Sequence, residues 1–148
     1  MDNLMLRRRV ILKAPIGRVD TTPKIAEYGK YLGRSNTGTG TDENWCYTIW
    51  YDIIPEPGIS NRLEIGNCDI DAYRTYQFTT SSGGADWDYR KYSGTNYYTL
   101  AANANKIRIN IPINNLSICY ALIASTGQIL FAGEDTIYYG YKNINDMP

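Results

Sequence analysis

The segment Trp45–Gly58, WCYTIWYDIIPEPG, constrains the fold of this chain more than any other stretch. Its aromatic and β-branched residues alternate with a period of two, which places successive side chains on opposite faces of a strand. Pro55, Pro57 and Gly58 then end the strand, because proline lacks the N–H group that a sheet ladder needs. The segment predicts one strand over 45–54 in a β-rich domain, and it contains no sign of a reaction centre.

Similar segments recur along the chain, bounded mostly by Gly, Asn, Asp or Ser. They predict a short strand or helical turn at 27–32 and strands at 62–65, 72–80, 86–92, 97–100, 106–111, 117–124, 128–132 and 136–141. Ser81–Gly84 and Ser125–Gly127 predict hairpin turns. No helical period of 3.6 persists over a dozen residues. We therefore expect an all-β fold, a single jelly-roll-like β-sandwich over residues 25–148.

Two segments predict what this sandwich exposes. In Lys106–Ile111 the isoleucines alternate with charged and amide residues, the pattern of a strand with one wet face. Gly33–Thr41 consists of turn-forming residues and predicts a surface loop.

The composition favours a non-enzymatic domain. A chain of 148 residues fits one domain with its own core. It contains no histidine, the commonest general base and metal ligand, so we expect no catalytic site, cofactor or metal. Cys46, Cys68 and Cys119 are odd in number and form no C-x-x-C pair. They predict buried thiols, with one disulfide in an oxidising compartment as the alternative.

The N-terminal segment, residues 1–24, carries six basic and two acidic side chains, a net charge of +4, which leaves −4 on residues 25–148. It predicts an extended arm, or a first strand, that docks on an acidic partner. The alternative is that the arginines only keep an apolar leader soluble. Apolar neighbours of the arginines favour protein contact over nucleic acid. The docking residues that we predict are Leu4, Leu6, Arg7, Arg8, Arg9 and Ile11.

Arg8 and Arg9 superficially match a twin-arginine export signal, but proline and charged residues follow at once instead of an apolar stretch. No other segment is apolar enough to span a membrane. We expect a soluble chain made in the cytosol.

An aromatic run on the 86–92 and 97–100 strands offers chemistry for a glycan or partner patch, made by Trp87, Tyr89, Tyr92 and Tyr97. The alternative is that alternate members of the run face the core. The carboxylate pairs Asp69/Asp71 and Asp86/Asp88 are interpreted as solvated loop positions, with calcium binding and catalysis as lesser alternatives.

A family resemblance rests on four segments in order: Gly29–Leu32, Asn44–Tyr47, Tyr51–Gly58 and Leu100–Ile109. Together they resemble a β-sandwich module, jelly-roll and carbohydrate-binding-module-like in shape, of tail, fibre and head-decoration proteins of tailed bacteriophages. The leader resembles the short arms of structural proteins of gut phages, including crAss-like ones. The sequence departs from the family at Ala101–Ala102, where proline-alanine is usual.

The resemblance and the arm together predict a virion structural protein, such as a capsid decoration, head-fibre or tail accessory subunit. Its expected partners are other virion proteins and symmetric copies of itself, without cofactor, nucleic acid or membrane. It would be made in the host cytoplasm and reside in the virion. The alternative is a carbohydrate-binding module that recognises host-surface glycans. A polysaccharide-cleaving enzyme is the least favoured hypothesis, because histidine is absent.

Overall fold

The protein is an all-β sandwich in a computed structural model of the chain. The structure describes the backbone of residues 5–11, 21–35, 37–54 and 61–143. Within these it describes the side chains of residues 21–35, 37–54, 61–67, 76–90 and 95–136. All strand pairs in these ranges are antiparallel, as the alternating pattern of the sequence predicts.

One layer of the sandwich is built around β7 (Ala104–Pro112). On one edge, β7 pairs with β3 (Thr39–Thr48) and then with the short β4 (Tyr51–Asp52). On its other edge it pairs with the second half of β5 (Arg62–Thr80). The layer ends at β2 (Ile25–Leu32), which pairs with β3.

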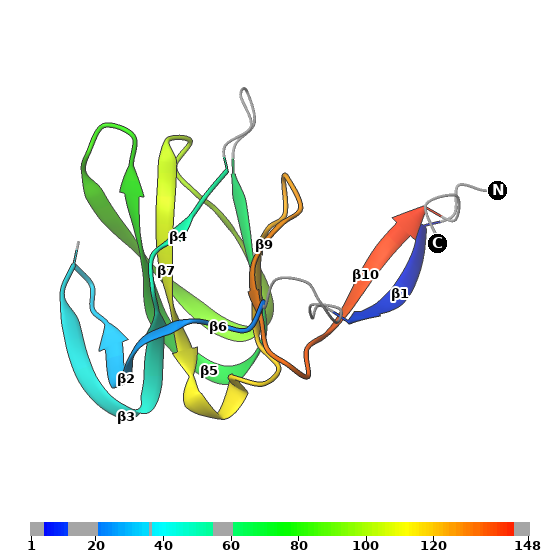
Figure 1. Cartoon of the computed structure of the whole chain (residues 1–148), viewed down its shortest axis with the longest axis horizontal. Helices are drawn as coiled ribbons and strands as arrows, with labels where there is room; N and C mark the ends of the chain where they lie inside the picture. The colour runs from blue at the N-terminus through cyan, green and yellow to red at the C-terminus, as the bar shows by residue number, and fades with distance from the viewer. Residues whose placement is uncertain (1–4, 12–20, 36, 55–60, 144–148) are drawn as a thin grey trace.

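The hairpin of β5 with β6 (Ala85–Thr99) runs through both layers. The first half of β5 pairs with β8 (Tyr120–Ile123), which pairs in turn with β9 (Gln128–Ala132). The register of β5 shifts between Ile65 and Ala72, and Asn67 there adopts a φ of 60°. Such bulges bend a strand, so β5 and β6 turn from one layer into the other (Figure 1).

The core lies between the two layers. Ile107, Ile109 and Ile111 of β7 contribute one side, and Leu63 and Ile123 belong to the same buried cluster from the other side. The predicted inward face of the β7 segment is confirmed. A 3-10 turn, η1 (Ile113–Asn115), leads from β7 toward β8. The predicted hairpin turns after β5 and β8 are also confirmed, with Gly83 and Gly127 at φ 91° and 81°.

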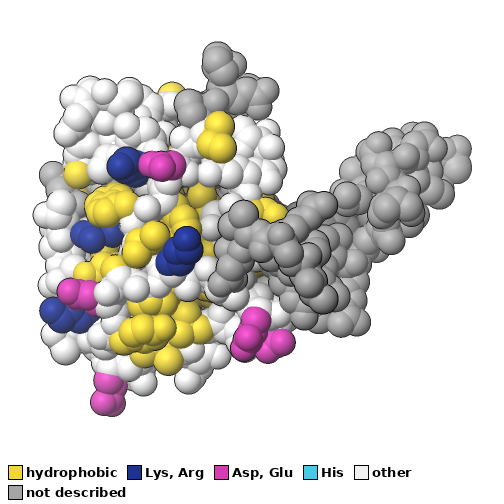
Figure 2. Space-filling view, viewed as in Figure 1, with side chains coloured by type: hydrophobic (Ala, Val, Ile, Leu, Met, Phe, Trp, Pro, Cys, Tyr) yellow, Lys and Arg dark blue, Asp and Glu magenta, His cyan; other side chains and the backbone are white. Residues whose placement is uncertain are grey.

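A separate ribbon joins the two ends of the chain. β1 (Met5–Ile11) pairs along its whole length with β10 (Ile137–Asn143), and these two strands form a two-stranded sheet of their own. Figure 1 shows this ribbon standing away from the sandwich. In the same view of the sandwich, hydrophobic side chains lie among scattered basic and acidic ones (Figure 2).

Several predicted boundaries are wrong. The single strand expected over 45–54 is broken at 49–50 into β3 and β4. The loop expected over 33–41 is shorter, because β3 begins at Thr39 and pairs with β2. The segments 62–65 and 72–80 are one bent strand, as are 86–92 and 97–100. In the loop and in the two bent strands, pairing between β2 and β3 and between β5 and β6 overrides the local turn signals.

Candidate functional site

The predicted docking residues lie on the ribbon. Leu4 falls outside the described residues, whereas Leu6, Arg7, Arg8, Arg9 and Ile11 are all in β1. In the register with β10, Arg7 is opposite Tyr141, Arg8 opposite Gly140 and Arg9 opposite Tyr139. The basic segment is therefore a first strand, paired with a tyrosine-containing strand more than a hundred residues later in the sequence.

The predicted aromatic patch is spread along β6. Tyr89 and Tyr97 are exposed and Trp87 is half-buried, while the side chain of Tyr92 lies outside the described residues. Tyr89 is opposite Thr75 and Tyr97 opposite Glu64, so the two tyrosines belong to opposite halves of the strand. Eight residues of extended strand span at most about 26 Å. Each of the two rings carries its own arginine: Arg34 lies 4.7 Å from the Tyr89 centroid and Arg62 lies 4.7 Å from that of Tyr97.

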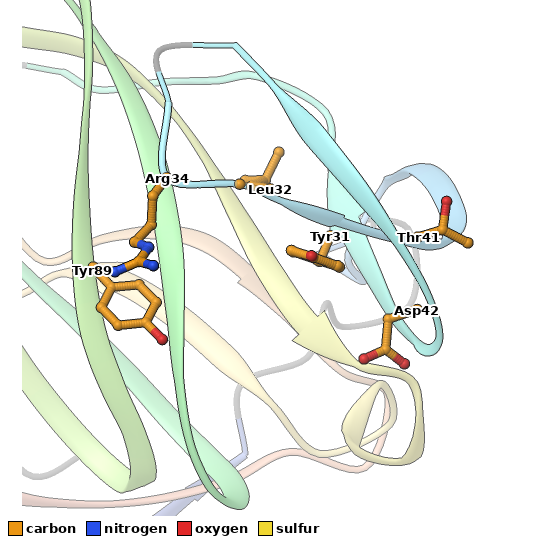
Figure 3. Close-up of a pocket in the computed structure, with 7 residues that line it drawn as sticks. Tyr31, Leu32, Arg34, Thr41, Asp42 and Tyr89 are labelled. Carbon is orange, nitrogen blue, oxygen red and sulfur yellow. The ribbon is translucent and has the colours of Figure 1, made fainter.

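Tyr89 also lines a cavity of about 340 Å³ between the β2–β3 hairpin and β6 (Figure 3). The lining residues are Tyr31, Leu32, Gly33, Arg34, Thr41, Asp42 and Tyr89. In Figure 3, Arg34 and Tyr89 lie at one end, Thr41 and Asp42 at the other, and Tyr31 between them. We call this space the hairpin cavity.

Tyr31 reaches its place because Gly40 faces it. The two residues are direct partners in the β2–β3 register, and a Cβ atom on Gly40 would overlap the Tyr31 ring. An aromatic ring lying across a strand glycine packs against the glycine backbone. The same pairing recurs between Tyr120 and Gly66, where the Tyr120 hydroxyl donates to the buried carboxylate of Glu64.

A buried amide holds the loop that carries Arg34. The Nε2 atom of Gln77, which is fully buried in β5, donates to the carbonyl oxygens of Gly33, Ser35 and Gly38 at 3.2, 3.0 and 2.9 Å. The carbonyls of Gly33 and Gly38 also accept from the backbone N–H groups of Ser35 and Gly33, so the amide adds a donor from the sheet to a loop with hydrogen bonds of its own.

Arg108 of β7 fixes this amide in turn. Its Nε and Nη2 atoms donate to the Oε1 atom of Gln77 at 2.9 and 2.6 Å, and Nη2 also donates to the carbonyl of Thr37. The guanidinium lies 4.6 Å from the centroid of Trp50 and 5.2 Å from that of Tyr47. Burial lowers the pKa of Arg108 from its ordinary value.

A second buried amide holds the end of β2. Asn110 accepts a hydrogen bond from the backbone N–H of Leu32 at 2.7 Å and donates to the Leu32 carbonyl at 3.2 Å. Asn110 and Gln77 lie on the face of the sheet that the sequence predicts to be wet. That prediction is wrong for Asn110, which is fully buried, because the β2–β3 hairpin covers this face.

Asp86 and Asp88 lie in strand β6, so the loop position expected for this carboxylate pair is wrong, and both side chains have partners within the protein. Asp86 accepts from the backbone N–H of Trp87, and Asp88 accepts from the hydroxyl of buried Tyr76 at 2.7 Å and lies 3.9 Å from Arg90. The side chains of Asp69 and Asp71 lie outside the described residues. Within the described part of the chain, no group of three or more His, Cys, Asp or Glu residues is placed to hold a metal ion.

Cys46 and Cys119 are buried free thiols, as predicted, and burial raises the pKa of Cys46 to about 12. The side chain of Cys68 lies outside the described residues. None of the helical residues that the structure describes belongs to a segment long and apolar enough to cross a membrane.

Sequence reasoning missed Tyr31, Arg34, Asp42 and the two buried amides. Arg34 was hidden in a segment of turn formers. The one available signal is Gly40. Once the β2–β3 register is known, this glycine lies opposite an aromatic residue, Tyr31.

Comparison with protein-family models, curated proteins and solved structures finds no match. The comparisons therefore assign no family, and the phage resemblance remains a prediction.

Proposed function

We propose that this chain is a non-enzymatic structural subunit of a virion that docks through the β1–β10 ribbon. The observation that carries the proposal is the pairing of β1 with β10 in a two-stranded sheet of their own. An isolated two-stranded ribbon is only marginally stable in water, so contact with a partner surface would stabilise it.

The ribbon offers two means of docking. Among the residues that the structure describes, each of its strands pairs along one edge only, and a free strand edge is a template for strand addition. Arg7, Arg8 and Arg9 lie between apolar residues, which suits a partner surface that is acidic and partly apolar. A neighbouring copy of this chain would supply an acidic surface, because its residues 25–148 carry a net charge of −4.

Incorporation into particles tests the proposal. A tagged chain expressed in cells that produce the particles should sediment with them through a density gradient. Arg7→Glu, Arg8→Glu and Arg9→Glu together should release it, because the reversed charges would repel an acidic surface.

The matched control is Lys24→Glu, Lys30→Glu and Lys106→Glu together. It changes the net charge by the same amount at positions outside the β1–β10 ribbon, and two of these lysines, Lys30 and Lys106, make exposed ion pairs. The control chain should still co-sediment. Equal retention of both triple variants, or absence of the unaltered chain from particles, would contradict the proposal.

Glycan binding is a second candidate, favoured by the exposed rings of Tyr89 and Tyr97 with a guanidinium over each. Aromatic rings beside polar donors are the chemistry that recognises sugar rings. A glycan array probed with the purified chain tests it, and binding should persist when residues 1–13 are deleted. An array without any bound glycan would exclude this candidate.

A further inference from the structure

The hairpin cavity presents opposite charges at its two ends. Arg34 supplies guanidinium donors beside the Tyr89 ring, and Asp42 supplies carboxylate acceptors at the far end (Figure 3). Its volume of about 340 Å³ falls in the range of small-ligand sites. A ligand of either net charge would be attracted at one end of the cavity and repelled at the other, so a ligand without net charge fits best.

The wall of the cavity is held rigidly. Asn110 fixes the backbone of Leu32, and Gln77 fixes the carbonyl of Gly33, so the residues on either side of them cannot shift freely. Both amides are fully buried. Buried polar groups that are fully satisfied rigidify their surroundings, and a rigid wall reduces the entropy lost when a ligand binds.

The lining groups match a hydroxyl-rich ring. A sugar hydroxyl both donates and accepts, so it can bond to Asp42 at one end and to Arg34 at the other. The C–H face of a pyranose is apolar and packs against aromatic rings, which Tyr31 and Tyr89 supply. Thr41 adds a further hydroxyl to the lining.

We propose that the hairpin cavity binds a neutral pyranose unit of a saccharide. This inference rests on the second candidate function, glycan binding, and is independent of docking through the ribbon. Asp42 would accept from ligand hydroxyls, Arg34 would donate to them, and the Arg34–Tyr89 stack would hold the guanidinium in position.

Titration of the isotope-labelled full chain with the methyl pyranosides of glucose, galactose, mannose and N-acetylglucosamine tests the proposal. At least one should shift the backbone amide resonances of Arg34 and Thr41. Tyr89→Ala removes the ring that stacks on the Arg34 guanidinium, and Asp42→Asn removes a hydrogen bond to a charged group. Each variant should therefore weaken that binding about tenfold or more. Asp42→Asn retains the Oδ1 atom that accepts from the backbone of Asn44.

The matched control is Tyr28→Ala, which removes an exposed tyrosine of β2 that does not line the cavity. It should change the affinity less than about twofold, as expected for a position without a ligand contact. Tyr97→Ala and Trp87→Ala separate the cavity from the rest of the aromatic run on β6, because neither residue lines the cavity.

The outcomes separate this site from the broader function. Binding that is lost with Trp87→Ala or Tyr97→Ala but not with Tyr89→Ala would overturn the cavity and keep glycan binding. Absence of binding by all four pyranosides, together with an array without signal, would overturn both. Neither result bears on the ribbon, which the particle experiment tests.

Discussion

Gln77→Leu is the sharpest test of how the β2–β3 hairpin is held. Leucine has nearly the volume of glutamine, so the change removes hydrogen bonds with little change in packing. Three loop carbonyls lose their bonds from the amide, although those of Gly33 and Gly38 keep a backbone donor. Arg108 loses the acceptor that receives two of its N–H groups. The hairpin loop should loosen, and the hairpin cavity with it.

The magnitude follows from these bonds. The two N–H groups of the amide contribute about 1 kcal/mol each, and the bonds from the guanidinium about 1.5 kcal/mol each. Arg108 keeps the Thr37 carbonyl and is half-buried, so water recovers part of the loss. We expect the free energy of unfolding to fall by about 3–4 kcal/mol, a large share of the ~5–15 kcal/mol typical of a domain.

Urea unfolding followed by tryptophan fluorescence measures this change, with Gln128→Leu as the control. Gln128 also bridges backbone groups, donating to the Asp52 carbonyl and accepting from the Ile54 N–H, but these partners are exposed. The control should cost less than about 1 kcal/mol, because water replaces exposed hydrogen bonds. Equal losses for the two variants would refute the argument that the buried amide clamps the loop.

Two further predictions concern a glycine and a thiol. Gly133→Ala should lower the free energy of unfolding by about 1–3 kcal/mol, because the new Cβ would overlap the backbone of Ser117. The control Gly84→Ala creates no such overlap and should change the free energy of unfolding by less than about 0.5 kcal/mol. Urea unfolding of both variants checks this, and equal effects would contradict it. Cys46 should resist alkylation in the folded chain at about pH 8 and react once urea unfolds it, as peptide-resolved mass spectrometry would reveal. Because burial raises the Cys46 pKa from 9.0 to about 12, the thiol stabilises the fold below about pH 9, and this contribution should be lost as pH rises toward 12. Alkylation of Cys46 in the folded chain, or stability that rises between these pH values, would show that the thiol is not buried in solution.

The sequence predicted the class of the fold from local patterns. Alternation in Lys106–Ile111 placed three isoleucines on one face, and all three are in the core. Turn residues at Ser81–Gly84 and Ser125–Gly127 located two hairpins. These features depend on neighbours in the chain, whose geometry is set by the backbone period.

The candidate sites were only partly predictable. The sequence predicts an aromatic patch that includes Tyr89, but it predicts a loop over 33–41, where the structure has the turn of the β2–β3 hairpin and the start of β3. Arg34 and Asp42 reach the hairpin cavity only after β2 and β3 pair and fold over the sheet. The two amides that hold the hairpin carry no local signal of burial: alternation predicts a wet face for Asn110, and no pattern in the 72–80 strand marks Gln77 as buried.

By itself, then, the sequence determined which residues of each strand share a face and that the strands form a sandwich. The tertiary structure decided what covers each face: the β2–β3 hairpin buries Gln77 and Asn110, and β10 pairs with the basic strand β1. A period of two states which side chains lie together, but not which distant segment lies over them. Which segment covers a face depends on the energy of pairing between segments far apart in the chain, and a local sequence pattern does not reveal this energy.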